Sequence, residues 1–428
     1  MSRIAFLRSI EIQQADPYLN ELRARLARDA IQVKIFYTDG HCGPGDFPGE
    51  SEKVDPAISP GALVDALLEW RPDAVISLSI PDENALRDAV VKRQLAQHGI
   101  PMVMHDLETV NLLSNKWETK QLLAAHGLTT PPAILADGDL LNDRNLVVPA
   151  YRDVVLLRAR ALGFPLITKP LWDCLGNGMQ VLRDARDLRA YLDRPYDGNL
   201  MLERFVAGEL CSVEIVGAPG RYVVQPMLWM GPAGDGPTAT FGRLRYVAPR
   251  EEADQAFRPV AASLVRLCET LGITGAIDLD MIYVDGEYHV LEINPRVSGA
   301  TTLSIAGSGL NTYDCLVSMA QGDWPASLPE DPGATRRMAL QFPVRAFTEE
   351  LHRDIAENLC LVRAISYHIG DAVLPNIVIT SELGEAHRLP PILKALDAEH
   401  GFLEPAVLDQ IVSVVHRERP RAATPAAV

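Results

Sequence analysis

Residues 289–299 read HVLEINPRVSG, an apolar strand pattern that ends in a carboxylate, an amide, a proline and an arginine. Side chains two residues apart point to the same face of a strand, so Glu292, Asn294 and Arg296 should lie together on one face. Such a stretch is either a solvated strand end or a place where oxygen ligands and a fixed cation meet. The sequence around it decides between these two interpretations.

The hairpin before this stretch determines whether a second acid can join it. Asp280 lies twelve residues before Glu292, and Asp285-Gly286 between them is a strong signal for a turn. A strict two-residue turn would put Leu279 on the face of Glu292, whereas a loop with an odd residue count or a β-bulge would set Asp280 opposite Glu292. Two buried carboxylates repel unless a cation lies between them. We therefore expect a metal site here, and a turn that is not a strict two-residue turn.

The composition is that of a folded protein with two or three domains, at 428 residues, 47% apolar and 22% charged. The formal net charge of −16 argues against non-specific nucleic-acid binding, although a local nucleotide pocket can still be basic. Six scattered cysteines without a C-x-x-C pair indicate neither a zinc knuckle nor a disulfide framework. No secretion signal and no membrane-spanning apolar run are evident. A reduced cytoplasm without membrane contact fits best.

Strand and helix patterns alternate in the first part of the chain. Apolar strand patterns occur at 4–7, 33–38, 73–79 and 101–105, with helical patterns between them. This alternation predicts a doubly wound parallel sheet. No G-x-G-x-x-G follows the first strand, so a dinucleotide-binding fingerprint is absent.

Two stretches in the middle of the chain contain features suited to phosphate and hydroxyl groups. PLITKP, residues 165–170, ends an apolar run with Lys169, and a lysine there needs an anionic partner. The loop that follows contains Gly176 and Gly178, which let backbone N–H groups approach phosphate without a Cβ in the way. LERFVAGELCSVEIV, residues 202–216, is a strand, a turn and a strand, with a glutamate on each side of the turn.

Four features in this order resemble the ATP-grasp superfamily, of the carboxylate–amine ligase type. They are a helix-borne lysine in SNKWETK (114–120), the strand lysine before a glycine loop, the Glu-turn-Glu segment, and the acidic hairpin that closes on E-I-N-P-R. The resemblance covers roughly residues 1–325. It implies an α/β protein of ATP-grasp architecture with these parts: an N-terminal doubly wound parallel-sheet domain at 1–110, an ATP-grasp domain at 111–330 whose two α+β lobes sandwich ATP (lid lobe roughly 128–205), a small C-terminal α+β domain at 331–418, and a disordered tail at 419–428.

The resemblance also assigns an ATP site. It implies the binding residues Lys116, Lys169, Gly176, Gly178, Glu203, Phe205, Val206, Glu209 and Leu291. The lysines and glycines would meet phosphates, and Glu203 with the backbone of Phe205 and Val206 would meet adenine. Glu209 would accept from the two ribose hydroxyls, a good match for one carboxylate, and Leu291 would flank the purine. Asn115 stands where the family usually has an acid before the first lysine.

For the metal the resemblance implies Asp280, Glu292 and Asn294, with Glu292 bridging two Mg²⁺ ions and Mn²⁺ as an alternative. Asp278 has the same parity as Asp280, so it is either a rival ligand or a solvated acid. Arg296 is the candidate catalytic residue, because a fixed guanidinium beside the metal would stabilise charge in phosphoryl and acyl transfer. A purely structural role, in which Arg296 pairs with Glu292 or Asp280, is the alternative.

The second substrate leaves a weaker signal in the sequence. Arg243 and Arg245, in a Gly/Pro-rich lid-like loop, would clamp a carboxylate bidentately. Ser298 and Gly299 would offer backbone donors near the acyl group, and Glu214 would meet an amine. The alternative is that the loop arginines are only solvated.

The resemblance implies an ATP-dependent ligase that activates a carboxylate as an acyl phosphate and couples it to an amine, an amino acid or small peptide, with release of ADP and phosphate. Its expected partners are small-molecule substrates, without nucleic acid or membrane, and a homodimer is left open. Alternatives are a carboxylate–thiol or carrier-protein ligase and a non-catalytic ATP-binding regulatory protein. The joint presence of Asp280, Glu292, Asn294 and Arg296 argues against the regulatory protein.

Overall fold

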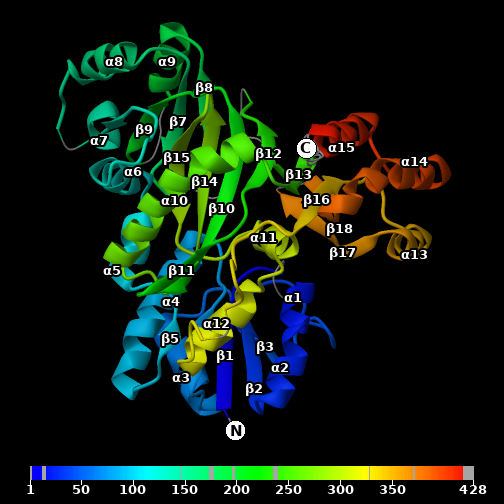
Figure 1. The fold of residues 1–428 in the computed structure, drawn as a ribbon. Helices are drawn as coiled ribbons and strands as arrows, with labels where there is room; N and C mark the ends of the chain where they lie inside the picture. The colour runs from blue at the N-terminus through cyan, green and yellow to red at the C-terminus, as the bar shows by residue number, and fades with distance from the viewer. Residues whose placement is uncertain are drawn as a thin grey trace, which may run out of the picture.

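The computed structural model describes residues 2–11, 16–144, 146–172, 178–194, 198–234, 240–326, 328–369 and 372–417. These residues form three β-sheets with helices packed around them (Figure 1). In Figure 1 a parallel N-terminal sheet lies at the bottom and a four-stranded sheet at the top, and a nine-stranded sheet between them extends to the C-terminal strands at the right. The predicted α/β class is confirmed.

The N-terminal unit is a parallel sheet with the strand order β3-β2-β1-β4-β5. Its elements are β1 (Ser2–Arg8), α1 (Pro17–Asn20), α2 (Leu22–Arg28), β2 (Ile31–Tyr37), β3 (Glu50–Lys53), α3 (Pro60–Trp70), β4 (Ala74–Ser77), α4 (Asp82–Leu95) and β5 (Met102–Val103). The four predicted strands are β1, β2, β4 and β5. The sequence pattern does not predict β3, because its residues, ESEK, are all exposed at the sheet edge. The chain leaves β1 and β4 toward opposite edges of the sheet, so the topological switch point lies between these two strands.

Two helices lead to a small antiparallel unit at the top of Figure 1. They are α5 (Leu107–Ser114) and α6 (Lys116–Ala125). The unit has the strand order β6-β9-β7-β8 and its elements are β6 (Ala133–Ala136), α7 (Gly138–Leu141), α8 (Tyr151–Leu162), β7 (Leu166–Pro170), β8 (Gln180–Leu182), α9 (Ala185–Leu192) and β9 (Leu200–Arg204). It has its own apolar core, to which Leu166, Leu188 and Leu202 contribute. This unit occupies the range predicted for the lid lobe.

The central sheet contains β10 (Glu209–Ala218), β11 (Arg221–Val224), β12 (Leu228–Pro232), β13 (Arg245–Val247), β14 (Gly275–Val284) and β15 (Glu287–Asn294), with α10 (Glu251–Leu271), α11 (Thr301–Ser308) and α12 (Thr312–Gln321). Along one face of β10, β14 and β15, Val213, Leu279 and Ile293 form an apolar row that belongs to the same core as residues of α10. The other face is polar and carries the candidate site. Helix α12 contacts β4 and β5 on one side and β10 and β14 on the other, so it joins the N-terminal unit to the central sheet.

The C-terminal strands extend the central sheet instead of forming a sheet of their own. Strand β13 pairs with β16 (Arg337–Pro343), and the order continues β16-β18-β17. The remaining elements are α13 (Glu349–Asn358), β17 (Cys360–Ile369), β18 (Ala372–Glu382), α14 (Leu389–His400) and α15 (Pro405–Arg417). The α+β content predicted for 331–418 is present, but a boundary at 331 divides a continuous sheet. The predicted tail, 419–428, lies outside the described residues. Among the described helices, none is long and apolar enough to cross a membrane.

Candidate active site

The polar face of the central sheet carries two cross-strand rows of side chains. Strand pairing sets Asp280 opposite both Ser212 and Glu292, and sets Asp278 opposite both Glu214 and Asn294. Directly paired residues project to the same side of an antiparallel sheet. Three carboxylates, Asp278, Asp280 and Glu292, are therefore neighbours on one face, as the period-2 pattern predicts for Glu292 and Asn294.

A β-bulge creates this register. The turn at Asp285-Gly286 is a two-residue turn, since Val284 pairs with Glu287, so the prediction that it is not a strict two-residue turn is wrong. Met281 then pairs with Val290 while Asp280 pairs with Glu292, and Leu291 is the extra residue between them. The bulge, which was the other option left open by the sequence, places the two acids together. Leu291, predicted to flank the purine, is this bulge residue.

The charge on this face is balanced by lysine. Lys116, the first residue of α6, lies with its Nζ 2.6 Å from Oε2 of Glu292. Asn115 caps α6 by accepting from the backbone N–H groups of Trp117 and Glu118, which explains the residue that replaces the family's acid: it orients the helix, while Glu292 orients the lysine. Burial would raise the pKa of Glu292, but the charges of Lys116 and then of Lys169 hold it below its usual value.

Asp280 is the acid that lacks this compensation. Burial, and then the charges of Asp278 and Glu292, raise the pKa of Asp280 well above its usual value. The Asn294 amide donates to it, with Nδ2 3.4 Å from Asp280 Oδ2. Carboxylate oxygens such as those of Asp280 and Glu292 suit Mg²⁺, which binds carboxylates together with phosphate oxygens, and the Asn294 amide, whose Oδ1 accepts from Arg296, would add an oxygen ligand after a turn of its side chain. The residues present therefore fit a divalent cation at Asp280, Glu292 and Asn294.

Asp278 is less suited to a metal, because its carboxylate is already bonded. Ser212 donates its hydroxyl to Oδ1 of Asp278 at 2.5 Å, and the Ser298 hydroxyl is a second hydrogen-bond partner that lowers the pKa of Asp278 against the larger effect of burial. Because of these hydrogen bonds, Asp278 is neither a solvated acid nor an unbonded carboxylate that is free to bind a metal.

A buried ion-pair cluster lies at the antiparallel unit. Glu203 on β9 is held between two lysines, with Lys169 Nζ 2.5 Å from Oε1 and Lys120 Nζ 2.7 Å from Oε2. All three side chains are buried, and burial lowers the pKa of Lys120. The prediction that Lys169 needs an anionic partner is thus met within the chain by Glu203. In the ligand-free chain this carboxylate is engaged with the lysines and not available to adenine.

The connector between β9 and β10 carries the other residues predicted to bind adenine and ribose. The backbone N–H of Phe205 donates to Pro165 O at 3.0 Å, so only its carbonyl is left for a purine edge. Val206 follows it in the connector. Glu209, at the start of β10, accepts from Arg250 Nη1 at 2.7 Å, and Arg250 in turn stacks on the Trp229 ring with its Cζ 3.8 Å from the centroid.

The glycine loop is only partly described. Gly178 has a φ of +78°, a left-handed conformation that favours glycine, and a Cβ at this position would lie 3.0 Å from Pro170 Cγ. The prediction for Gly176 lies outside the described residues. The backbone N–H of Lys116 donates to Leu171 O at 2.9 Å, which joins the first residue of α6 to the start of this loop.

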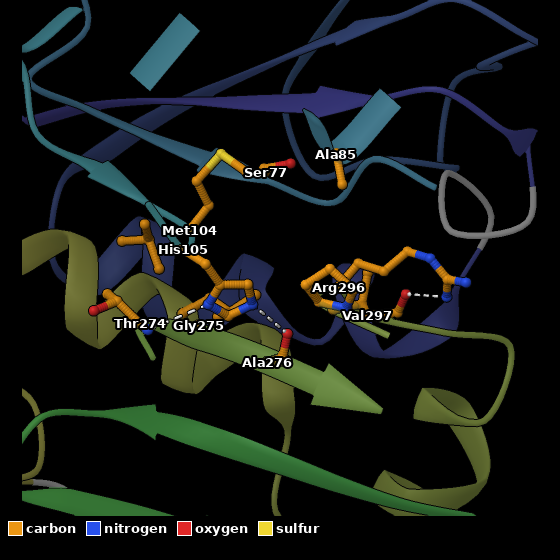
Figure 2. Close-up of a pocket in the computed structure, with 12 residues that line it drawn as sticks. Ser77, Ala85, Met104, His105, Thr274, Gly275, Ala276, Arg296 and Val297 are labelled. Atoms are coloured by element: carbon orange, nitrogen blue, oxygen red, sulfur yellow. Dashed lines mark hydrogen bonds between the residues drawn. The ribbon is translucent and has the colours of Figure 1, made fainter. Parts of the chain in front are cut away.

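Arg296 lies where the central sheet meets the N-terminal unit. Its Nε donates to Oδ1 of Asp82 at 2.7 Å and its Nη2 donates to Oδ1 of Asn294 at 3.1 Å. Asp82 is the first residue of α4, so a residue of the N-terminal unit positions the candidate catalytic arginine. The charge of Arg296 also opposes the raised pKa of Asp280, so the alternative of a buried network with that acid stays open. Figure 2 shows Arg296 and Val297 beside the junction with the N-terminal unit.

The residues predicted for a second substrate are mostly occupied. Both carboxylate oxygens of Glu214 accept from threonine hydroxyls, those of Thr301 and Thr312, and burial raises its pKa to about 7. Glu214 therefore lies against α11 and α12 and does not offer a free oxygen to an amine. The carboxyl group is a structural one in this arrangement.

The two arginines of the lid-like loop do not form a clamp. Arg243 donates to Pro232 O at 2.6 Å, whereas Arg245 is buried on β13 and donates to Gly299 O at 3.3 Å and Gln341 Oε1 at 3.2 Å. The Ser298 N–H donates to Thr301 Oγ1 at 3.2 Å, so it is not free for an acyl group. The bidentate clamp and the Ser298 backbone donor are therefore not present in this arrangement.

Sequence reasoning missed three residues that the fold brings into the site: Lys120, Asp82 and Arg250. Lys120 carried a usable signal, because it lies four residues after Lys116 and so on the same helix face. Asp82 and Arg250 gave none, since each meets its partner only through tertiary packing.

Residues 113–300 match the model of the ATP-grasp domain. Over 254 residues the chain is 26% identical to carbamoyl-phosphate synthase of Methanobrevibacter smithii, an alignment that covers 58% of this chain and 64% of that protein. Over 227 residues it is 24% identical to D-alanine–D-alanine ligase of Syntrophotalea carbinolica, covering 52% of this chain and 69% of that one. The chain thus spans less than two thirds of the first of these relatives.

Solved structures resemble almost the whole chain. An L-amino acid ligase from Bacillus licheniformis superposes with a TM-score of 0.66 at 18% identity, covering 93% of this chain and 98% of that one. An N5-carboxyaminoimidazole ribonucleotide synthetase from Thermus thermophilus gives a TM-score of 0.67 at 17% identity, with coverage of 92% and 98%. At these identities the likeness establishes the fold.

Proposed function

The chain carries an ATP-grasp domain, as its sequence predicts, and from this premise we propose that it is an ADP-forming ligase that couples a carboxylate to an amine through an acyl phosphate. The observation that carries the proposal is the polar face on which Asp280, Glu292 and Asn294 meet Lys116 and Arg296. A binding protein without turnover would have no need to bury an uncompensated Asp280 beside two other acids.

The proposed reaction has two steps. A carboxylate oxygen of the first substrate attacks the γ-phosphorus of ATP, the bond from that phosphorus to the β–γ bridging oxygen breaks, and ADP leaves. The amine of the second substrate then attacks the acyl carbon, inorganic phosphate leaves, and the nitrogen loses a proton. Both steps place negative charge on oxygen, which positioned cations stabilise.

Two lysines are proposed to exchange partners when the nucleotide binds. Lys169 and Lys116 are held by Glu203 and Glu292 in the ligand-free chain. Phosphate oxygens would become their new partners, and Glu203 would keep Lys120 and gain freedom to reach the adenine amino group. The buried ion pairs thus keep the lysines in place before ATP arrives.

A divalent cation, Mg²⁺ or Mn²⁺, would be held by Asp280, Glu292 and Asn294 and would supply positive charge at the phosphates. Arg296 lies next to this set through Asn294, and Asp82 fixes its guanidinium from the other side. We assign Arg296 the stabilisation of the transferring phosphoryl group and of the acyl oxygen.

An amino acid or short peptide is the proposed acceptor class. D-alanine–D-alanine ligase and L-amino acid ligase are named for joining amino acids, and both share the fold. The deciding experiment measures phosphate release from ATP across a panel of amino acids and carboxylic acids, with product masses read by mass spectrometry. Amide products with ADP support the proposal. Turnover with thiols alone would replace it with a thiol ligase, and no turnover with any pair would favour a binding protein.

A further inference from the structure

The N-terminal sheet presents a buried arginine at its topological switch point. Arg8 is the last residue of β1, and its Nη1 donates to Leu78 O just beyond the end of β4 at 3.2 Å. In open α/β sheets ligands bind outside the carboxyl ends of the strands at this point. Arg8 therefore occupies the position in the unit where a ligand is expected.

Within the part of the chain that the structure describes, two of the three nitrogens of Arg8 have no hydrogen-bond partner. Its side chain is fully buried, and Nε and Nη2 make no hydrogen bond. The acids whose charges act on Arg8 are Asp39 and Asp88. Asp88 is paired with Arg87 Nη2 at 2.7 Å, and among the described residues neither acid forms a hydrogen bond with Arg8. A buried guanidinium with two unfilled donors costs free energy, and an anionic partner would offset this cost.

A second buried arginine reinforces the positive charge. Arg363, on β17 of the C-terminal strands, lies close enough to Arg8 to lower the Arg8 pKa, after the larger effect of burial. Arg363 Nη1 lies 3.8 Å from Oδ2 of Asp16, and Asp16 also accepts hydrogen bonds from the hydroxyls of Thr302 and Tyr313. Two arginines from the two ends of the chain thus lie near each other, and one of them, Arg363, is paired with the buried Asp16.

One short chain segment links this place to the candidate active site. The Ser9 hydroxyl donates to Ile80 O at 2.6 Å, and two residues later Asp82 holds Arg296. The segment from Ile80 to Asp82 therefore leads from the Arg8 position to the residue assigned to acyl transfer.

We propose that Arg8, with Arg363 beside it, binds an oxyanion on the amine substrate, one that does not react. For an amino acid acceptor this group is its free carboxylate. The inference rests on the proposed ligase function and narrows its substrate class to anionic amines. Two donors of one guanidinium, Nε and Nη2, match the two oxygens of a carboxylate or phosphate.

The test compares anionic and neutral acceptors in the Arg8→Met variant. The acceptors are amino acids against their carboxamides, and phosphoethanolamine against ethanolamine, so that a carboxylate and a phosphate are distinguished. Loss of charge-assisted hydrogen bonds should lower kcat/KM for the anionic acceptor about 10- to 100-fold. The kcat/KM for the neutral acceptor and the KM for ATP should stay unchanged. The control, Arg3→Met, removes an arginine with an unpartnered buried Nε from the opposite end of the same strand.

Stability provides a second measurement. Since Arg8 is an uncompensated buried charge, Arg8→Met should keep or raise the melting temperature of the free chain. Inorganic phosphate or succinate should raise the wild-type melting temperature and should not do so in Arg8→Met. This shift needs no turnover, so the oxyanion site can stand even if the ligase proposal fails. The oxyanion site would be overturned if Arg8→Met lowered kcat/KM equally for anionic and neutral acceptors. It would also be overturned if anions raised the melting temperature of Arg8→Met as much as that of the wild type.

Discussion

Individual lysines in this chain are placed by acids, and we propose that nucleotide phosphates replace these acids as partners. Lys169, Lys120 and Glu203 form a buried group with two positive charges and one negative charge. The excess positive charge lies in the unit that covers the polar face, which suits an anion with several oxygens. The contacts with Glu203 hold both lysine side chains in fixed positions in this buried group.

Replacing Lys169 by methionine should weaken ATP binding. Removing one partner of a buried charge pair costs about 2–5 kcal/mol, so the ATP dissociation constant should rise about 30-fold or more. Isothermal titration calorimetry measures it. Lys34→Met is the matched control, since Lys34 is also a strand lysine paired with a glutamate, but in the N-terminal sheet. ATP affinity unchanged in Lys169→Met would remove Lys169 from the site.

Replacing Glu292 by glutamine should abolish most turnover. The change removes a proposed metal ligand and the partner of Lys116, and loss of metal-based charge stabilisation should cost roughly 100-fold or more in kcat. The readout is phosphate release with saturating Mg²⁺. Glu287→Gln, an exposed position on the same strand, should behave as wild type. Comparable rates for the two variants would show that Glu292 holds no metal.

At the scale of single elements, the sequence predicted which side chains share a face of a strand better than it predicted the register between paired strands. The period-2 spacing correctly grouped Glu292 with Asn294, because alternation is intrinsic to a strand. It could not reveal the bulge at Leu291, since the Asp285-Gly286 turn is regular and the extra residue has no turn-type signature. Nor could it reveal the partner of Arg296, because Asp82 is supplied by the docking of a distant helix.

The tight approach of the β9–β10 connector to β14 leads to a prediction for Gly208. A Cβ there would lie 2.5 Å from Ile282 Cγ2 and 2.7 Å from Tyr283 O. Gly208→Ala should therefore destabilise the fold by about 1–3 kcal/mol through overpacking, as measured by urea unfolding. Gly61→Ala, in a helix with open space around its Cβ position, should be neutral or stabilise by less than about 1 kcal/mol. Equal stability of the two variants would contradict this packing argument.

The junction between β5 and β14 leads to a prediction of acid sensitivity. Figure 2 shows His105 between the two units, where Nε2 contacts Ala276 O at 3.1 Å and Thr274 N donates to Nδ1 at 3.3 Å. A cavity of about 10 Å³, room for one water molecule, lies beside it. Burial lowers the pKa of His105 to about 4 from its ordinary 6.5. The junction is therefore built for a neutral imidazole.

Because the folded pKa is depressed, the unfolded chain binds a proton that the folded chain does not between pH 6.5 and pH 4. The stability contribution is complete above pH 6.5 and is lost as the pH falls, by up to about 3 kcal/mol. His105→Gln, which cannot titrate, should lose less stability than wild type over this interval. Urea unfolding at pH 7 and pH 4.5 measures the difference, with exposed His98→Gln as control. If the free energy of unfolding fell equally for wild type and His105→Gln between pH 7 and pH 4.5, the junction would not be the source of the acid sensitivity.

At the scale of the whole molecule, three units meet around one polar face. The N-terminal unit contributes Asp82, the antiparallel unit contributes Lys169, and the central sheet contributes the acids. The sequence revealed each unit by its local pattern but not the joining of β13 to β16, because strand partners from distant segments leave no local signature. This is why the sequence predicted a domain boundary at 331, where the structure has one continuous sheet.

The shared sheet predicts that the chain cannot be divided at residue 331. Leu340 and Phe342 of β16, Leu393 of α14 and Ile411 of α15 belong to the same buried cluster as Leu279 of β14. Truncation to residues 1–330 would expose this apolar surface and leave β13 as an unpaired edge, a template for aggregation. We expect fragment 1–330 to aggregate and fragment 331–428 to lack a cooperative melt, whereas the full chain should melt cooperatively by circular dichroism. A monomeric fragment 1–330 that melts cooperatively and binds ATP would show that the C-terminal strands are dispensable, and that the boundary read from the sequence is the physical one.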